Sequence, residues 1–557
     1  MKEKIEAAVR GALARLGAPD AAFVVEYPPA ETGADYACNA ALVAGKQLGQ
    51  KPRDVAVAMH AALEEAHISG VEKIEIAGPG FLNIFLSSES RATAIVAARE
   101  EGDRWGSNDA WSGKTIMVEY TDPNPFKEFH IGHLMSNAIG ESVARLFEHS
   151  GADVIRANYQ GDVGPHVAKA IWGLLQEGLA QSTVAQISAA YVRGAAAYEE
   201  NTDAKREIEE INKKVYEKSD EKINALYAWG REETLKHFED IYALLGTSFD
   251  EYFFESETGP RGLEVVHAHP ELFVESDGAI VFHGEEHDPK LHTRVFVNKQ
   301  GLPTYEAKEI GLAQMKRERC AFDRSITVTA LEQEAYFNVV FTALELIYPE
   351  WKGVFEHIHH GMMQLQSGKM SSRKGNVITG ESLIGDMITA AKEKMGERGV
   401  ANPEEVARQI AVAAIKFSVL KQGAGKNIIF DPEKSLSLEG ESGPYIQYAH
   451  TRCVSVLKRA EEESVALSAH VRGGIAPDIE RLLPRFPEVV ERAAVQYEPH
   501  FVAQYLIELS SAFNSWYAQE RILGTPDAAD KLALVSAVRQ TLKNGLWLLG
   551  ISAPEEM

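Results

Sequence analysis

The alternation of hydrophobic and polar residues divides the chain into three stretches, of which the first is residues 1–112. It begins with MKEKIEAAVRGALARLG, in which apolar residues recur at helical spacing with charges between them. Its later segment VEKIEIAGPGFLNIFLS reads as two strands joined by a tight turn at GPG. The pattern therefore predicts a small α+β domain over residues 1–112.

The second stretch, residues 113–435, alternates short apolar strands with amphipathic helices. TIMVEY is a strand, an apolar helix follows a proline-containing turn, and DVIRANY is the next strand. SITVTAL and FEHIHHGMM continue the strands after an insertion of charged helices and short strands at about 183–300. Strand, helix, strand units build parallel sheets, so the expected fold class is α/β with a doubly wound, Rossmann-like domain.

The third stretch, residues 436–557, is helical in pattern. Apolar stripes run through YIQYAHTRCVSVLKRA, HFVAQYLIELSSAFNSWYAQERIL and LALVSAVRQTLKNGLWLLG. These stripes predict a separate all-α helix bundle at the C-terminus.

Composition and charge narrow the classes of function. A chain of 557 residues with 45% hydrophobic and 25% charged residues is typical of a globular protein with several domains. No uncharged apolar run reaches the roughly 18 residues of a membrane span, and a net charge of −24 argues against a nonspecific nucleic-acid coat. The three cysteines, Cys38, Cys320 and Cys453, lie far apart, so we expect no structural zinc and a cytoplasmic location.

Two histidines, His130 and His133, stand at the expected start of the first helix of the second stretch. Zinc-binding pairs on helices usually lie four residues apart, as in H-E-x-x-H, so a metal site is disfavoured. Two histidines without a role are the other alternative. The position favours a phosphate site, because strand ends and helix N-termini in such sheets bind phosphates. Gly132 between them would let a phosphate approach the backbone.

A second segment, the basic stretch GKMSSRKGN, also suits phosphate binding. Its loop, residues 369–376, is flanked by glycines and carries lysines and serine hydroxyls that can close over a polyphosphate. Phosphoryl and adenylyl transfer depend mainly on positioning and charge neutralisation. The candidate residues of this loop are Lys369, Ser371, Ser372 and Lys374.

HIGH (130–133) and KMSSR (369–373) resemble the two signatures of class I aminoacyl-tRNA synthetases. VEYTDPNPFKEFHIGH, NYQGDVGPHVA and SLEGESGPYIQYAHTR resemble segments of the arginyl-tRNA synthetase family in particular, and the likeness extends over nearly the whole chain. The resemblance implies an arginine–tRNA ligase that uses L-arginine, ATP with Mg²⁺ and tRNA(Arg), and that is a monomer. The first domain would contact the tRNA elbow and the last would bind the anticodon.

The resemblance also implies roles for individual residues. The catalytic and ATP-binding set would be His130, Gly132, His133, Lys369, Ser371, Ser372 and Lys374, with the pyrophosphate-stabilising charge on Lys369 or Lys374. Arginine would be held by Glu119, Tyr305 and Glu309 at its guanidinium and by Asn124 at its α-amino group. The tRNA would be contacted by Tyr445, Tyr448, Arg452, Tyr517 and Met557. Carboxylates and an aromatic ring suit a planar guanidinium.

This sequence departs from the family pattern at three positions. Glu309 stands where the family usually has Asp, Met135 where Arg is common, and Val163 where Trp is usual. A synthetase for another amino acid therefore stays open, beside a nucleotidylyltransferase with a smaller substrate and a non-catalytic tRNA-binding relative. Neither of the last two needs all three predicted domains together with both phosphate-binding segments.

Overall fold

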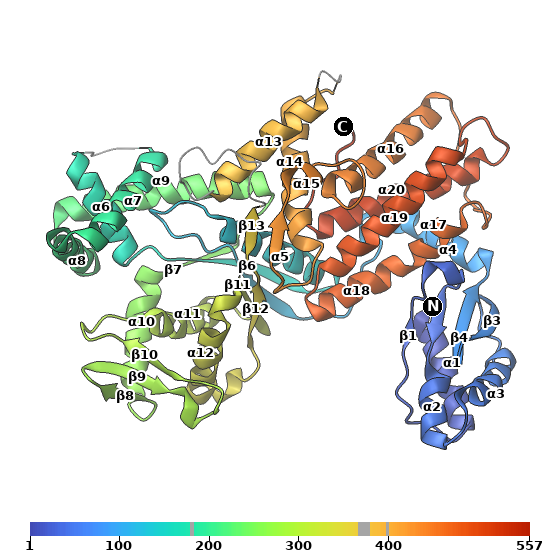
Figure 1. Cartoon of the computed structure of the whole chain (residues 1–557), viewed down its shortest axis with the longest axis horizontal. Helices are drawn as coiled ribbons and strands as arrows, with labels where there is room; N and C mark the ends of the chain where they lie inside the picture. The colour runs from blue at the N-terminus through green and yellow to red at the C-terminus, as the bar shows by residue number, and fades with distance from the viewer. Residues whose placement is uncertain (179–182, 366–378, 397–399) are drawn as a thin grey trace. The chain divides into compact units, whose positions relative to one another are not determined.

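The computed structural model describes residues 1–178, 183–365, 379–396 and 400–557 (Figure 1). These residues form two compact units, each built from separate parts of the chain. The first unit comprises Met1–Trp105, Cys453–Phe486 and Ser511–Thr541, and the second comprises Gly106–Arg452, Pro487–Ser510 and Leu542–Met557.

The N-terminal part of the first unit is an antiparallel sheet of four strands packed against helices. The strand order is β1-β2-β4-β3, and the hairpin predicted for VEKIEIAGPGFLNIFLS is confirmed as β3 and β4. Gly80 closes its turn at φ +141°, and a side chain there would press against the Pro52 backbone. The elements are α1 (Lys2–Arg15), β1 (Val25–Glu26), β2 (Tyr36–Cys38), α2 (Ala40–Leu48), α3 (Pro52–Glu65), β3 (Val71–Ala77), β4 (Phe81–Leu86) and α4 (Ser88–Glu101).

A parallel sheet of five strands is the centre of the second unit. Its order is β12-β11-β5-β6-β7, so the chain extends the sheet from β5 in one direction and later adds β11 and β12 on the other side of β5. The strands are β5 (Thr115–Glu119), β6 (Asp153–Gln160), β7 (Glu251–Phe254), β11 (Arg324–Ala330) and β12 (Phe355–His360). The predicted doubly wound fold is confirmed, and its switch point lies between β5 and β11, where such sheets bind ligands.

Helices cover both faces of this sheet. On one face, α5 (Ile131–His149) lies against β5, β6 and β11, so closely that a side chain at Gly140 would meet the Tyr120 ring. On the other face, Leu312 of α11 (Tyr305–Arg319) packs on Met117 and Ala157. The two helices that border the site are therefore held by the apolar strand residues that the hydrophobic pattern identified.

Further helices and strands surround the sheet. A helical group packs around its own apolar core, and three antiparallel strands pack with α10, α11 and α12. The helices are α6 (Pro165–Glu177), α7 (Val184–Glu200), α8 (Thr202–Glu217), α9 (Glu221–Leu245), α10 (Glu255–Ala268), α12 (Glu334–Ile347), α13 (Gly380–Met395), α14 (Pro403–Leu420) and α15 (Pro432–Ser435). The strands are β8 (Phe273–Ser276), β9 (Ala279–His283), β10 (Thr293–Val297), and the parallel pair β13 (Met363–Leu365) and β14 (Ile428–Phe430).

The C-terminal stretch is helical, as the apolar stripes predicted. Its helices are α16 (Gly443–Glu462), α17 (Pro477–Leu482), α18 (Phe486–Gln496), α19 (His500–Gln519) and α20 (Ala528–Leu548). Four of them, α16, α18, α19 and α20, contribute residues to both compact units. Among the helices of the described ranges, none is long and apolar enough to cross a membrane.

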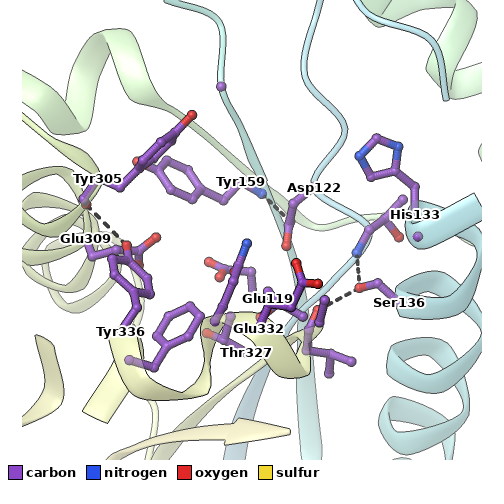
Figure 2. Close-up of a pocket in the computed structure, with 18 of the residues that line it drawn as sticks. Glu119, Asp122, His133, Ser136, Tyr159, Tyr305, Glu309, Thr327, Glu332 and Tyr336 are labelled. Carbon is purple, nitrogen blue, oxygen red and sulfur yellow. Dashed lines mark hydrogen bonds between the residues drawn. The ribbon is translucent and has the colours of Figure 1, made fainter. Parts of the chain in front are cut away.

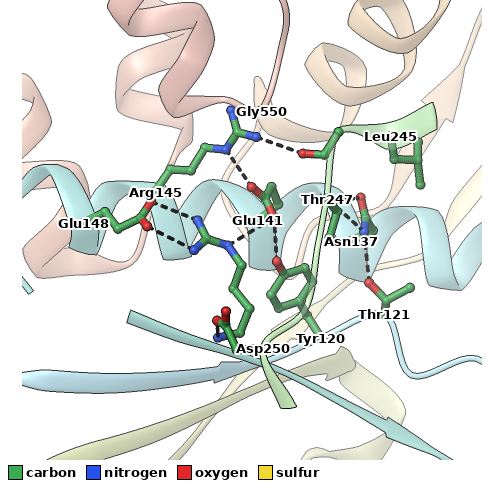
Figure 3. A network of polar contacts seen from close by, with 12 residues as sticks. Tyr120, Thr121, Asn137, Glu141, Arg145, Glu148, Leu245, Thr247, Asp250 and Gly550 are labelled. Atoms are coloured by element: carbon green, nitrogen blue, oxygen red, sulfur yellow. Dashed lines mark hydrogen bonds and ion pairs between the residues drawn. The ribbon is translucent and has the colours of Figure 1, made fainter. Parts of the chain in front are cut away.

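A buried polar network surrounds Glu141 on α5 (Figure 3). Its carboxylate accepts hydrogen bonds from the Tyr120 hydroxyl at 2.5 Å and from Arg145 Nε at 2.6 Å, and Arg156 Nε lies 3.5 Å away. Arg156 also donates to both oxygens of Glu148. Because Glu141 is 2% exposed, its charge depends on these partners for compensation.

The same region of α5 is joined to the end of the chain. Three side-chain donors reach backbone carbonyls of the segment 547–550: Ser142 Oγ to Leu548 at 2.7 Å, Arg145 Nη1 to Trp547 at 2.9 Å, and Lys416 Nζ to Gly550 at 2.9 Å. The last carbonyl groups of a helix have no hydrogen-bond partner within the helix, so they need other donors when they are buried. The network therefore fixes the helix that carries His133 against the C-terminal segment.

Replacing Glu141 with glutamine is expected to destabilise the second unit by about 3 kcal/mol, because it leaves Arg145, whose side chain is only 15% exposed, without its charged partner. Urea denaturation followed by tryptophan fluorescence measures the effect. Burial raises the pKa of Glu141, but Arg145, Arg156 and Lys416 outweigh it and hold the pKa below its usual value. This contribution to stability is present above the usual glutamate pKa and is lost as the pH falls through the lowered one.

The matched control is Glu148→Gln, since Glu148 pairs with Arg156 at 2.9 Å but its side chain is 37% exposed. We expect that variant to lose less than about 1 kcal/mol. Equal losses for the two variants would contradict the role assigned to burial.

Candidate active site

A cavity of about 450 Å³ opens at the C-terminal ends of β5 and β11 (Figure 2). Its wall combines the last residue of β5, the turn that leads into α5, the start of α5, one side of α11 and the start of α12. Of the predicted site residues that the structure describes, it brings together Glu119, Asn124, His130, Gly132, His133, Tyr305 and Glu309. The cavity is therefore the candidate active site.

The turn between β5 and α5 has a strained backbone. Thr121, Asp122 and Phe126 have φ values of 80°, 48° and 68°, a region that non-glycine residues rarely adopt. Local bonds hold it: the Thr121 amide donates to Ser136 Oγ at 2.9 Å, and the Tyr159 amide donates to the Asp122 carboxylate at 2.8 Å. The strain places Asp122 in the cavity wall, as Figure 2 shows.

His130 and His133 cap the start of α5 reciprocally. The His133 amide donates to His130 Nδ1 at 3.3 Å, and the His130 amide donates to His133 Nδ1 at 3.1 Å. The two rings stack with centroids 3.4 Å apart. A side chain at Gly132 would lie 2.9 Å from the His130 ring, so this arrangement needs glycine between the histidines.

This geometry determines which ring atoms can meet a ligand. Loss of water around the His130 ring, with Lys127 nearby, lowers its pKa to about 4, and burial lowers the pKa of His133 well below its usual value. Both rings are therefore neutral at pH 7. Because each Nδ1 accepts a backbone hydrogen bond, each Nε2 carries the proton and can donate to a phosphate oxygen. Lys127 adds a positive charge beside them, which the sequence patterns did not identify.

A zinc site receives no support from the geometry. Within the described part of the chain, no three His, Cys, Asp or Glu side chains are grouped so that they could hold a metal ion. The Nδ1 atoms of the histidine pair are already occupied by backbone donors.

Three carboxylates converge behind the histidines. Glu119 is 1% exposed, and its Oε2 lies 2.7 Å from the Lys316 ammonium. Loss of water and the nearby Glu119 raise the pKa of Glu309 to about 8, and the same two causes raise the pKa of Asp122 well above its usual value. Like charges in a dry site disfavour one another's ionisation. The cavity is therefore prepared for a cation.

Aromatic and amide groups complete the cavity. Tyr305 is 62% exposed at its edge, and the Tyr336 hydroxyl donates to the Tyr305 carbonyl at 3.3 Å. Asn124 Oδ1 accepts from the Gly161 amide at 3.1 Å, which fixes the orientation of its amide group and leaves one oxygen lone pair for another donor. Gln333 also lines the cavity.

The sequence patterns did not identify several residues in or near the cavity wall. Asp122 lies in the cavity wall only because of its positive φ, which no local residue pattern indicates. Lys316 follows Tyr305, Glu309 and Leu312 at helical spacing, a signal that could have identified it. Glu255 lines the cavity, but its Oε2 lies 2.5 Å from buried Lys308 and is already paired.

Two of the departures from the family pattern lie outside the cavity wall. Met135 is a buried residue of α5, 2% exposed, and Val163 packs in the apolar core of α6 to α9. Neither lines the candidate site. Glu309 is the departure that does.

The remaining predicted site residues either do not line the cavity or lie outside the described residues. The loop residues Lys369, Ser371, Ser372 and Lys374 lie outside the described residues. On α16, Tyr445 and Tyr448 are half-buried, and the Arg452 guanidinium lies 4.3 Å from the Tyr448 ring centroid. Tyr517 contacts the Phe513 ring, and Met557 packs on the core formed by α9, α13 and α14.

Comparison with known proteins identifies the class. A family model described as tRNA synthetases class I (R), catalytic domain, matches residues 97–432. Models of the arginyl tRNA synthetase N terminal domain and the DALR anticodon binding domain match residues 2–86 and 446–557. The fold and these matches define a class I aminoacyl-tRNA synthetase.

Relatives over the full length specify the family. The chain is 32% identical to arginine–tRNA ligase of Clostridium perfringens over 96% of both chains, and 30% identical to that of Alkaliphilus metalliredigens over 100% of this chain and 99% of that one. The structure of Thermus thermophilus arginyl-tRNA synthetase is similar with a TM-score of 0.82 and 26% identity, covering 100% of both chains. The chain belongs to the arginyl-tRNA synthetase family.

Proposed function

We propose that this chain ligates arginine to tRNA(Arg) in the cavity between β5 and α11. The observation that carries the proposal is the convergence of Glu119, Glu309 and Asp122 on one dry wall, beside two histidines whose free nitrogens are donors. The carboxylate wall suits a guanidinium, and the histidine donors suit phosphates. Few substrates other than an arginine with ATP require both.

Arginine selection is assigned to the carboxylate wall. Glu119 and Glu309 would each accept from one edge of the guanidinium, and Tyr305 would cover its face. Asn124 Oδ1 would accept from the α-amino group. A lysine ammonium is compact and cannot donate to two separated carboxylates in the same planar manner.

Activation is assigned to the histidine pair and the basic loop. One arginine carboxylate oxygen attacks the α-phosphorus of MgATP. The bond between that phosphorus and the pyrophosphate leaving group breaks, and arginyl-adenylate forms. His130 and His133 donate from Nε2 as negative charge grows on the phosphates, with Gly132 between them. Ser371, Ser372 and either Lys369 or Lys374 would bind the departing pyrophosphate.

Transfer completes the reaction. The 2′-hydroxyl of the terminal adenosine of the tRNA attacks the arginyl carbonyl, and AMP leaves as the hydroxyl proton is lost. The domain over residues 1–112 would contact the tRNA elbow. Tyr445, Tyr448, Arg452, Tyr517 and Met557 would contact the anticodon loop, where rings can stack on unpaired bases.

The setting of the reaction is a further part of the proposal. The enzyme would act as a monomer in the cytoplasm, a compartment that suits three unpaired cysteines, two of them buried.

The direct test is tRNA charging with each of the twenty amino acids in turn, with MgATP and total tRNA. We expect arginine to be charged and lysine to be charged at least about 1,000-fold less efficiently, because its ammonium leaves one buried carboxylate unpaired. Efficient charging with a different amino acid, or none with arginine, would contradict the assignment. A Glu119→Gln variant should lose arginine affinity while its KM for ATP stays unchanged.

A further inference from the structure

One side of α11 carries three polar residues and one leucine that lie in or near the cavity wall. Tyr305, Glu309, Leu312 and Lys316 are spaced by four, three and four residues, so they share one side of the helix. Tyr305 lies at the edge of the cavity and Glu309 in its wall, as Figure 2 shows. Lys316 lies further along and does not line the cavity.

Lys316 is held behind the cavity by two oxygen atoms. Its side chain is 3% exposed, and its Nζ lies 2.7 Å from Glu119 Oε2 and 3.3 Å from Ser325 Oγ. Ser325, on β11, is fully buried. The ammonium therefore contacts Glu119 from a buried position that does not line the cavity.

Two other cations near the cavity, Lys308 and Arg294, are paired with other carboxylates. Lys308 Nζ lies 2.5 Å from Glu255, and Arg294 Nη1 lies 3.3 Å from Glu306. Glu119 in turn has two further carboxylates close by, Asp122 and Glu309. A buried carboxylate among other carboxylates needs a fixed counter-charge, because an unpaired buried charge is costly.

We propose that Lys316 is a positioning residue for arginine, fixing Glu119 so that one carboxylate oxygen pairs with the ammonium while the other stays directed at the guanidinium. The proposal rests on the function proposed above, in which Glu119 binds arginine. A charge that only orients a binding group acts on substrate affinity and leaves the chemical step to the histidine pair. Lys316 thus extends the arginine site by one residue that never contacts the substrate.

The first experiment replaces Lys316 with methionine, which keeps the apolar stem and removes the charge. We expect the KM for arginine to rise about 10- to 100-fold, because Glu119 loses its buried partner, while kcat and the KM for ATP change less than about threefold. The matched control is Lys531→Met. Lys531 is also buried, with a side chain 8% exposed, and pairs with Glu520 and Asp527 in the other compact unit. It should leave the KM for arginine unchanged.

The second experiment asks whether Lys316 acts through Glu119. If it does, adding Lys316→Met to Glu119→Gln should raise the KM for arginine less than twofold beyond the single Glu119→Gln change. Effects that multiply independently would overturn the proposal, as would an unchanged KM in Lys316→Met alone. A wild-type enzyme that fails to charge arginine would instead refute the proposed function.

A milder variant keeps the test decisive if Lys316→Met does not fold. Ser325→Ala removes the second partner of the ammonium and retains its charge. We expect a two- to fivefold higher KM for arginine with kcat unchanged, and an unchanged KM would overturn the positioning role.

Discussion

His133→Asn is expected to lower kcat for tRNA charging by about 100- to 1,000-fold while the protein remains folded. The asparagine oxygen stands where Nδ1 of the histidine stands, so it can still accept from the His130 amide and preserve the cap of α5. Nothing in asparagine replaces the Nε2 donor. Loss of one preorganised donor to a developing charge has an effect of this size in other enzymes. Charging assays at saturating arginine and ATP measure it.

His133→Gln is the complementary variant. Its terminal amide nitrogen reaches the position of Nε2 and restores a donor, but the helix cap is lost, at a cost of about 1 kcal/mol of stability. We expect it to be less stable than His133→Asn and more active. Thermal unfolding and kcat should therefore rank the two variants in opposite orders. If both variants lose activity only in proportion to their stability, the histidine is a structural cap and not a phosphate ligand.

The features that could be predicted from the sequence depend on local patterns. The strand TIMVEY, the helix after it and the position of His130 and His133 at that helix start follow from apolar spacing and a proline turn. Tyr305 and Glu309 share a helix face by their spacing alone. Local patterns identified His130, Gly132 and His133, and the family resemblance added Glu119, Asn124, Tyr305 and Glu309, which line the same cavity.

The features that could not be predicted depend on long-range pairing or unusual backbone. Lys316 meets Glu119 only because β5 and α11 pack together in the folded sheet. Asp122 enters the cavity through a left-handed backbone that Ser136 and Tyr159 hold from other elements. The short strand β14, which the hydrophobic pattern did not identify, forms because β13 offers a parallel partner. Such strained and charged positions are where local sequence rules commonly fail, because function imposes them.

Arginine binding is expected to release a proton near neutral pH. The KM for arginine is therefore expected to fall as the pH rises from 6.5 to 8. In the free site, loss of water and the charge of Glu119 raise the pKa of Glu309 to about 8, so this carboxyl is largely protonated at pH 7. A guanidinium beside it favours the carboxylate and lowers the pKa, so the proton must leave when arginine binds. The dependence should approach, at most, about tenfold per pH unit and level off above pH 8.

Glu309→Gln separates this effect from other titrations, because an amide has no proton to release. Titration calorimetry of arginine binding in buffers of different ionisation enthalpy should give close to one proton released by the wild type at pH 7 and none by Glu309→Gln. At pH 8.5 the variant should bind arginine about 10- to 100-fold more weakly, since one of the paired carboxylates is gone. Glu309→Asp, which restores the residue usual in the family, should keep the proton release. A wild-type KM that does not change between pH 6.5 and 8 would mean that Glu309 is not a ligand of the guanidinium, and that the pocket selects arginine through Glu119 and Asp122.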